Sequence, residues 1–471
     1  MVFSSHIFLF YFLPVSLLLY YSMPKRGKNI VLTAISYIFY GWSNPLFTLL
    51  MFFSTLVDYG CGLVIGTSAD SQQRRRKLAL FVSIGANLSL LGFFKYTGFA
   101  MESYNQIFTF LGVEGAEPVH VLNFLLPLGI SFYTFQSMSY TIDVYRRDGK
   151  HIRNFLDFAC FVSMFPQLVA GPIIRFQEVA DQLSNRVHSI EKFSRGVAFF
   201  AFGMAKKVLL ANSCGKIADM TFASANLSII DSWYGIVAYS FQIYFDFSGY
   251  SDMAIGLGLM FGFVFAKNFD SPYLSTSITE FWRRWHISLS TWLREYLYIP
   301  LGGNRKGGIR TAINLAIVML LGGLWHGASW NFVVWGAIHG VLLGSERLLG
   351  KKPFYSGLPK VLRIMVTFIF ILIAWVFFRA ETFGLALSYL SSMFGLAIVP
   401  ESSRLLAGII YSPYYLLAMA IAGIVVWKMP QTWDYTKRLT SGKVLSVVLV
   451  FILSVAVLSM QSYNPFIYFN F

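Results

Sequence analysis

Long apolar runs separated by short polar segments dominate the chain. A helix that crosses the hydrocarbon core of a bilayer needs about 20 mostly apolar residues. We therefore expect an all-α polytopic membrane protein with ten to twelve spans. Runs of suitable length predict spans at residues 2–22, 29–50, 51–67, 78–99, 122–142, 195–212, 232–264, 310–327, 331–349, 360–380, 406–427 and 444–460.

One further apolar stretch, residues 154–176, is interrupted by Pro166, Gly171 and Pro172. Irregular backbone at membrane depth is tolerated only where it is buried in protein or lines a cavity. This stretch therefore predicts a broken or re-entrant element.

Residues 127–143 place Ser131, Thr134, Ser137 and Thr141 along one side of a helix. Such a stripe is typical of contacts between membrane helices.

The composition supports the membrane class. Of 471 residues, 56% are hydrophobic and 13% are charged, against about 25% charged in a typical soluble domain. The aromatic content of 18% excludes a disordered chain. The apolar runs are unbroken, which excludes the alternating pattern of an outer-membrane barrel. The three cysteines are far apart and indicate neither a disulfide framework nor a metal site.

The net charge of +15 comes from short basic loops between the apolar runs. Basic loops beside membrane spans face the cytoplasm. The basic residues are therefore explained by membrane topology, and we expect no nucleic-acid partner. The same pattern predicts that both chain ends lie outside the cytoplasm. The loops in question are 25–28, 74–77, 146–153, 351–363 and 428–443.

Two carboxylates, Asp246 and Asp252, lie within the apolar run 232–264. Six residues correspond to about 240° around a helix, so they do not share a face as an acid–base pair would. We expect them to bind basic partners or to order a bent helix around Gly249. Asp246 as the lining of a reaction channel is the alternative.

Residues 278–308 combine tryptophans with arginines. Apolar positions from Trp282 to Tyr296 follow helical spacing and predict an amphipathic helix at the membrane–water interface, with Arg283 and Arg284 off the apolar stripe. The glycine-rich turn that follows carries Asn304 and Arg305 and has the chemistry to hold phosphates. An anchor on anionic lipid is the alternative interpretation.

His326 lies about 16 residues into an apolar stretch, at a depth of roughly 24 Å, beyond the middle of the hydrocarbon. Small residues around it let a ligand or another backbone approach closely. Histidine is the usual general base near neutral pH. An intramembrane histidine is often structural, but the surrounding glycines favour a catalytic role. These small residues are Gly322, Gly323, Gly327, Ala328 and Ser329.

Other chemistries lack their motifs. The sequence contains no nucleophile-elbow serine motif, no Walker A loop and no zinc-type His-Glu-x-x-His motif. A transporter or flippase stays open, because transporters also use broken helices with intramembrane polar residues. A scaffolding subunit without its own chemistry is the third possibility.

The string Glu280–Ser290, together with Tyr298–Arg305, resembles the membrane-bound O-acyltransferase (MBOAT) family, in particular its bacterial alginate O-acetyltransferase (AlgI-like) branch. Phe165–Pro172, Tyr244–Asp252 and Gly323–Gly327 agree in order and spacing. The resemblance covers essentially the whole chain. It implies a single MBOAT domain over residues 1–471, with a ring of membrane helices around a central funnel or tunnel.

The resemblance also implies the site. The family's membrane-embedded histidine maps onto His326, which we assign as general base, and its other motif histidine maps onto His286, which we assign a supporting, donor-side or channel role. No metal and no permanently bound cofactor is implied. Residues expected to line the channel or bind the donor are Trp325, Gly327, Asp246, Arg283, Arg284, Asn304 and Arg305.

The family's reaction moves an acyl group from a thioester to a hydroxyl, and acetyl-CoA is the expected donor. The resemblance implies a protein of the bacterial cytoplasmic membrane, embedded in lipid, that passes the group to an extracytoplasmic SGNH-type esterase-fold partner. That partner then modifies a polysaccharide. Alginate, another exopolysaccharide, cellulose and peptidoglycan all stay open as acceptors.

The aromatic tail, residues 462–471, ends in the pattern Phe-x-Tyr-x-x-Phe centred on Tyr468. This pattern resembles the acyl-carrying tail of small partner peptides in D-alanylation systems. The resemblance implies that the Tyr468 phenol accepts the acyl group at the outer mouth of the tunnel. An aromatic belt at the membrane interface is the alternative.

Overall fold

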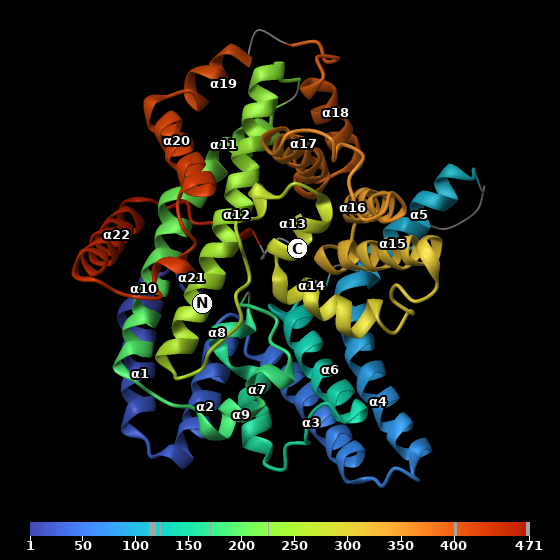
Figure 1. Ribbon diagram of the computed structural model, residues 1–471, viewed down its shortest axis with the longest axis vertical. Helices are drawn as coiled ribbons and strands as arrows, with labels where there is room; N and C mark the ends of the chain where they lie inside the picture. The colour runs from blue at the N-terminus through green and yellow to red at the C-terminus, as the bar shows by residue number, and fades with distance from the viewer. Residues whose placement is uncertain (113–118, 123, 170, 225, 400–402, 468–471) are drawn as a thin grey trace. The chain divides into compact units, whose positions relative to one another are not determined.

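The computed structural model describes residues 1–112, 119–122, 124–169, 171–224, 226–399 and 403–467, and the regular elements among them are all helices (Figure 1). The predicted all-α class is confirmed. Six helical stretches are long and apolar enough to cross a membrane, and together they make the chain a multi-pass membrane protein. They are Leu46–Thr67, Gln73–Phe110, Ile190–Phe222, Gly307–His326, Lys360–Arg379 and Ser441–Met460.

Three shorter apolar helical stretches accompany the six, at Phe8–Ser22, Phe383–Met393 and Pro413–Lys428. The number of spans between ten and twelve, the central tunnel and the single domain stay predictions.

Several predicted span boundaries are wrong. The spans predicted at 78–99, 122–142 and 195–212 correspond to helical stretches at Gln73–Phe110, Ile130–Arg146 and Ile190–Phe222. Prolines explain two further wrong boundaries. Helix α2 (Lys28–Gly41) ends before Pro45, so the boundary predicted at residues 50 and 51 lies instead at residues 42–45, before α3 (Leu46–Thr67). The predicted span 406–427 is divided before Pro413 into α19 (Ser403–Ile410) and α20 (Pro413–Lys428). A residue that precedes proline is disfavoured in the helical conformation, so helices end there.

The chain forms two compact units. The first consists of residues 1, 6–187 and 327–329, and the second of residues 2–5, 188–326 and 330–471. Besides α2 and α3, the main helices of the first unit are α1 (Leu13–Ser22), α4 (Gln73–Leu91), α5 (Thr97–Phe110), α6 (Ile130–Arg146), α7 (Phe155–Ser163), α8 (Phe165–Leu168) and α9 (Phe176–Asn185).

A buried carboxylate, Asp58 of α3, organises the polar groups of the first unit. Its oxygens accept hydrogen bonds from Ser83 at 2.6 Å, from Asn87 at 2.8 and 2.9 Å, and from Ser137. Ser83 is also 2.9 Å from Thr141. Two members of the predicted polar stripe of α6 therefore hold α6 against α3 and α4, and this structural interpretation of the stripe is confirmed.

The interrupted stretch 154–176 is broken, as predicted. Helix α7 ends at Ser163 and the four-residue α8 follows. The free backbone groups find side-chain partners, because the Phe165 N–H donates to Ser36 at 3.0 Å and the amide groups of Gln136 and Gln167 donate to the Phe161 carbonyl. The irregular backbone is thus buried in protein.

The second unit carries both motif histidines. Its helices are α10 (Ile190–Ala205), α11 (Asn212–Phe222), α12 (Ile229–Met260), α13 (Ile278–Arg284), α14 (Ile287–Leu293), α15 (Gly307–His326), α16 (Trp330–Leu348), α17 (Lys360–Arg379), α18 (Phe383–Met393), α19, α20, α21 (Thr432–Tyr435) and α22 (Ser441–Met460). The π-helical segment η4 (Lys206–Ala211) joins α10 to α11. Helix α12 runs without a break through Gly249. A Cβ atom on Gly249 would lie 2.7 Å from the Gly203 carbonyl oxygen, so this glycine permits the close crossing of α12 and α10.

Candidate functional site

His326 is the last residue of α15 and is 5% exposed. Its imidazole packs edge-on against three aromatic rings, with centroid distances of 5.0 Å to Trp325, 5.2 Å to Trp335 and 5.2 Å to Phe378. These rings come from α15, α16 and α17. The predicted general base therefore lies in a mostly apolar cage built by three helices.

Glycines let α15 and α16 lie side by side (Figure 1). A Cβ atom on Gly323 would lie 2.2 Å from the Phe332 carbonyl oxygen, and one on Gly336 would lie 2.4 Å from the Met319 carbonyl oxygen. Gly323, one of the small residues predicted to surround His326, therefore admits another backbone. The spacing of Gly336, Gly340 and Gly344 is the signal in the sequence that points to this contact.

Gly323→Ala is expected to lower the melting temperature of the detergent-purified protein strongly, because the backbone on the facing helix has nowhere to move. Overpacking of this kind costs about 1–3 kcal/mol or more. Gly322→Ala is the matched control, since its Cβ atom would meet only the Leu293 Cδ1 atom at 3.5 Å. Equal melting temperatures for the two variants would contradict this account of the α15–α16 contact.

His286 lies at a break between α13 and α14, where its backbone adopts a left-handed conformation with φ of 43°. The single helix predicted from Trp282 to Tyr296 is therefore wrong. A neighbouring segment supplies the cause: the Asn268 carbonyl accepts from the Ile287 N–H at 2.9 Å, and the Asn268 side chain accepts from the Ser288 N–H at 3.1 Å.

Two of the three tryptophans of this segment are buried in protein. Trp285 is 2% exposed and Trp292 is 5% exposed. An anchor among lipid headgroups needs exposed tryptophan rings. The segment 278–308 is therefore packed into protein at these positions, and both the predicted interfacial helix and the alternative lipid anchor are wrong for Trp285 and Trp292.

Hydrogen bonding fixes the tautomer of neutral His286. The Asn268 atom that receives the Ser288 N–H must be the carbonyl oxygen Oδ1, which only accepts. This oxygen lies 3.2 Å from His286 Nδ1, so Nδ1 carries the proton and donates. Nε2 then holds the free lone pair, and this buried nitrogen has no hydrogen-bond partner among the described residues.

Trp325 connects the two histidines. Its ring centroid lies 6.3 Å from that of His286 and 5.0 Å from that of His326. The structure therefore brings together three residues that the sequence assigns to the site, although His286 precedes His326 by 40 residues. Gly327 directly follows His326 and is buried.

A third buried histidine, His339, has a different setting. The Trp282 indole N–H donates to His339 Nδ1 at 3.3 Å. The acceptor nitrogen of His339 is thus already used. This histidine packs against Trp335, with a centroid distance of 4.9 Å, and we interpret it as structural.

Asp246 and Asp252 both bind basic partners, as predicted. Lys207 lies 2.6 Å from Asp246, and Lys206 lies 2.6 Å from Asp252. The side chains of Lys207 and Asp246 are each 2% exposed, so this ion pair is fully buried. A channel-lining role for Asp246 stays a prediction.

The described part of the aromatic tail enters the second unit beside this ion pair. The Ile467 N–H donates to Asp246 at 2.9 Å, and Lys207 donates to the Pro465 carbonyl. Phe466 stacks on Tyr250 at 4.3 Å and is 5% exposed. An aromatic belt would expose this ring to lipid headgroups, so that interpretation is wrong for Phe466. Tyr468 lies outside the described residues.

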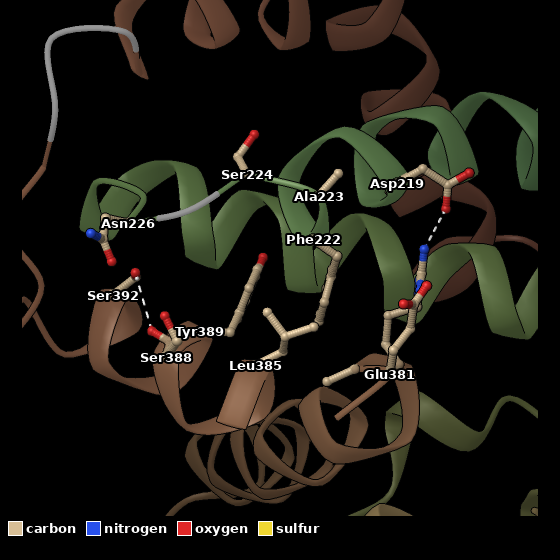
Figure 2. A pocket seen from close by; sticks show the side chains of 12 residues that line it. Asp219, Phe222, Ala223, Ser224, Asn226, Glu381, Leu385, Ser388, Tyr389 and Ser392 are labelled. Atoms are coloured by element: carbon tan, nitrogen blue, oxygen red, sulfur yellow. Dashed lines mark hydrogen bonds and ion pairs between the residues drawn. The ribbon is translucent and has the colours of Figure 1, made fainter. Parts of the chain in front are cut away.

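A cavity of about 330 Å³, which we call the Arg379 pocket, opens where α11 ends near α18 (Figure 2). Arg379 forms an ion pair with Asp219 at 2.8 Å, and Phe222 stacks on Tyr389 at 4.0 Å. The Tyr463 hydroxyl of the tail also donates to Asp219. One carboxylate thus connects the tail to this pocket.

A second cavity, of about 390 Å³, lies among α13, α15 and α16, and we call it the basic pocket. Two of the predicted donor-binding residues, Arg283 and Asn304, line it, and Arg347 and Lys351 join them. Arg347 and Lys351 are not predictable as part of this site from the sequence, because they follow Arg283 by more than 60 residues. The full lining is Ser277, Thr279, Glu280, Arg283, Tyr298, Asn304, Thr311, Leu315, Leu343, Arg347 and Lys351.

Arg284 and Arg305 do not line the basic pocket. Arg284 forms an ion pair with Glu280 at 2.8 Å and donates to the Asp270 carbonyl at 3.1 Å. Burial by itself raises the pKa of Glu280, but hydrogen bonds from Thr276 and Arg284 outweigh it and hold the pKa below its ordinary value. Glu280 is therefore an anion whose charge Arg284 balances. Arg305 is exposed in the turn.

Comparisons with known proteins show which family the chain is similar to. Residues 36–387, which include both motif histidines, match the family model described as MBOAT, membrane-bound O-acyltransferase family. The chain is 44% identical over 493 residues to the probable alginate O-acetylase AlgI of Pseudomonas putida, with 100% of each chain covered. It is 49% identical to the protein of that name from Pseudomonas aeruginosa, over 84% of this chain and 75% of the relative. The peptidoglycan O-acetyltransferase of Helicobacter pylori is 39% identical, over 84% of this chain and 80% of the relative.

Proposed function

The chain belongs to the membrane-bound O-acyltransferase family, and on that premise we propose that it O-acetylates a surface polysaccharide by moving acetyl groups from cytoplasmic acetyl-CoA to an extracytoplasmic acceptor. The names of the relatives favour alginate, with peptidoglycan as the second candidate. Such a path requires a tunnel through the bacterial cytoplasmic membrane. The transporter and scaffold alternatives are less favoured, because the family is one of acyltransferases.

The observation that carries the proposal is the pair of buried imidazoles in contact with Trp325. His326 takes the proton from the attacking hydroxyl as its oxygen bonds to the thioester carbonyl carbon. The tetrahedral intermediate then expels the CoA thiolate, and the imidazolium returns the proton to the leaving sulfur. Histidine is the usual general base near neutral pH, and general base catalysis contributes about 10²- to 10⁴-fold.

His286 supports the reaction from the other side of Trp325. Its Nε2 lone pair is free to accept a hydrogen bond from a substrate group, because Asn268 holds the proton on Nδ1. We assign it a positioning role on the donor side of the site. An SGNH-type partner outside the membrane receives the acetyl group and selects the polysaccharide.

Tyr468 is proposed as the first acceptor of the acetyl group. The support is local: the residue before it, Ile467, is buried and bonded to Asp246 inside the second unit. After incubation with acetyl-CoA, mass spectrometry of the C-terminal peptide should show the mass increase of one acetyl group that replaces a hydrogen atom. Tyr468→Phe should lose both this adduct and the export of acetyl groups. Full export by Tyr468→Phe, with no adduct trapped on the wild type, would contradict a carrier role.

The proposed function is tested with the purified protein and its partner. Acetyl-CoA labelled in the acetyl group should lose its label to the acceptor only when this chain is present. Uptake of intact labelled substrate into vesicles, with no transfer, would instead support the transporter. A failure of both reactions would support the scaffold.

A further inference from the structure

A short segment from the start of the chain, residues 2–5, lies inside the second unit beside the aromatic tail. Residues 6–187, which follow it directly, belong to the first unit. Phe3 and Ser4 are both buried. The first and last few residues of a domain are poorly ordered unless contacts tie them down. Residues 2–5, which we call the clip, are therefore held in the second unit by contacts of their own.

Aromatic stacking joins the clip to the tail. Phe3 stacks on Tyr250 of α12, with the ring centroids 4.5 Å apart and the ring planes inclined by 17°. The same tyrosine stacks on Phe466 of the tail, at 4.3 Å and 29°. Stacked aromatic pairs stabilise their contact beyond the burial of apolar area. One buried ring of α12 thus connects a ring of the clip to a ring of the tail.

A hydrogen bond joins the clip to the tail directly. The Asn464 side chain donates to the Ser4 backbone carbonyl at 2.8 Å. Because a backbone carbonyl only accepts, this contact places the amide nitrogen of Asn464 toward the clip. Its oxygen Oδ1 then accepts from Asn212 of α11 at 3.3 Å. Asn464 is therefore fixed from two sides, by the clip on one side and by α11 on the other.

Five consecutive residues of the tail each contact a different partner in the second unit. Two of them depend on the clip, since Asn464 bonds Ser4 and Phe466 shares Tyr250 with Phe3. The tail is thus held residue by residue up to the last described position. The five contacts are Tyr463 with Asp219, Asn464 with Ser4, Pro465 with Lys207, Phe466 with Tyr250 and Ile467 with Asp246.

We infer that the clip positions the tail for acyl transfer, with Phe3 and Ser4 as positioning residues for Tyr468. This inference rests on the proposed role of Tyr468 as acyl acceptor, and it assigns a function to a segment more than 450 residues away in the sequence. Phe3 acts through Tyr250, and Ser4 acts through Asn464. A small misplacement of a reacting group costs about 10²-fold in rate, so holding the tail matters for the chemical step.

The first arm of the experiment measures release of the tail by maleimide labelling of the full-length protein in detergent. Ile467→Cys supplies the reporter, because the substitution keeps the backbone N–H that donates to Asp246. Background labelling is low, since the three native cysteines are buried. Phe3→Ala in this background removes one stacked ring and should raise the labelling rate about tenfold.

Asn464→Asp is the second variant and changes a single atom of the side chain. It keeps an oxygen for Asn212 but replaces the N–H donor opposite the Ser4 carbonyl with a second acceptor. The reporter should therefore be labelled faster in this variant as well. This variant keeps the inference falsifiable if Phe3→Ala does not fold.

The second arm measures acetyl transfer by the same two variants without the reporter cysteine. We expect kcat per folded molecule to fall by about 10- to 100-fold, with the KM for acetyl-CoA nearly unchanged, because the tail acts on the acceptor side of the proposed reaction. Phe3→Leu refills most of the volume without a ring, so its kcat should lie between those of Phe3→Ala and the wild type. A purely structural role for the clip would lower the folded fraction and leave kcat per folded molecule unchanged.

Phe10→Ala is the matched control, since Phe10 also lies near the start of the chain but is 53% exposed. It should match the wild type in both arms. Labelling of Phe3→Ala and Asn464→Asp at the wild-type rate would overturn the inference, and so would faster labelling with an unchanged kcat. If the wild type transferred no acetyl group, the proposed function would fail, and the labelling rates would still decide whether the clip holds the tail.

Discussion

Replacing His326 with asparagine is expected to reduce acetyl transfer by about 100- to 10,000-fold, because the hydroxyl then attacks without a general base. The loss should fall on kcat, since a general base acts in the chemical step. Initial rates with labelled acetyl-CoA, normalised to folded protein by size-exclusion chromatography, measure the effect.

The matched control is His339→Asn. His339 is also buried, but its Nδ1 already accepts from the Trp282 indole, and the asparagine oxygen offers an acceptor in its place. This variant is expected to melt at a lower temperature and to keep its rate per folded molecule. If His339→Asn lost as much activity as His326→Asn, the assignment of the base to His326 would have no support.

Breaking the buried Lys207–Asp246 pair is expected to destabilise the protein by about 3–5 kcal/mol, because the remaining charge stays buried without its partner. Both Lys207→Met and Asp246→Asn should show this loss in equilibrium unfolding. The exposed pair Arg294–Glu295 gives a matched control, since Glu295→Gln should cost less than about 1 kcal/mol.

The same pair should hold the C-terminal tail. Asp246 accepts from Ile467 and Lys207 donates to Pro465, so both variants are expected to expose the tail to carboxypeptidase. The double variant Lys207→Met, Asp246→Leu removes both charges and should recover part of the stability but not the protection of the tail. Unchanged protease resistance in all three variants would show that the tail is held by other contacts.

Much of the fold follows from apolar run length, because a membrane imposes that length on every spanning helix. Pro45 and Pro413 are also visible in the sequence, and applying the proline rule strictly would have placed both helix boundaries. The polar stripe of α6 was predictable for a different reason, because buried hydroxyl groups need hydrogen-bond partners. Asp58, which lies in another apolar run, is such a partner.

The site was predictable only where its residues are close in sequence or share a motif. His286 and His326 were found from their motifs, and Asp246 from its cost in an apolar run. The break at His286 was not predictable, because Asn268, 18 residues earlier, supplies the bonds that replace the helix. The basic pocket was found only in part, since helix packing and not spacing brings Arg347 and Lys351 beside Arg283.

The most direct measurement uses proteoliposomes that hold the acceptor and partner inside and receive doubly labelled acetyl-CoA outside, with one label on the acetyl group and one on the adenine. The account predicts that the acetyl label reaches the enclosed acceptor while the adenine label stays outside, and that His326→Asn vesicles accumulate neither. Entry of both labels together, or equal acetyl labelling with His326→Asn, would contradict it.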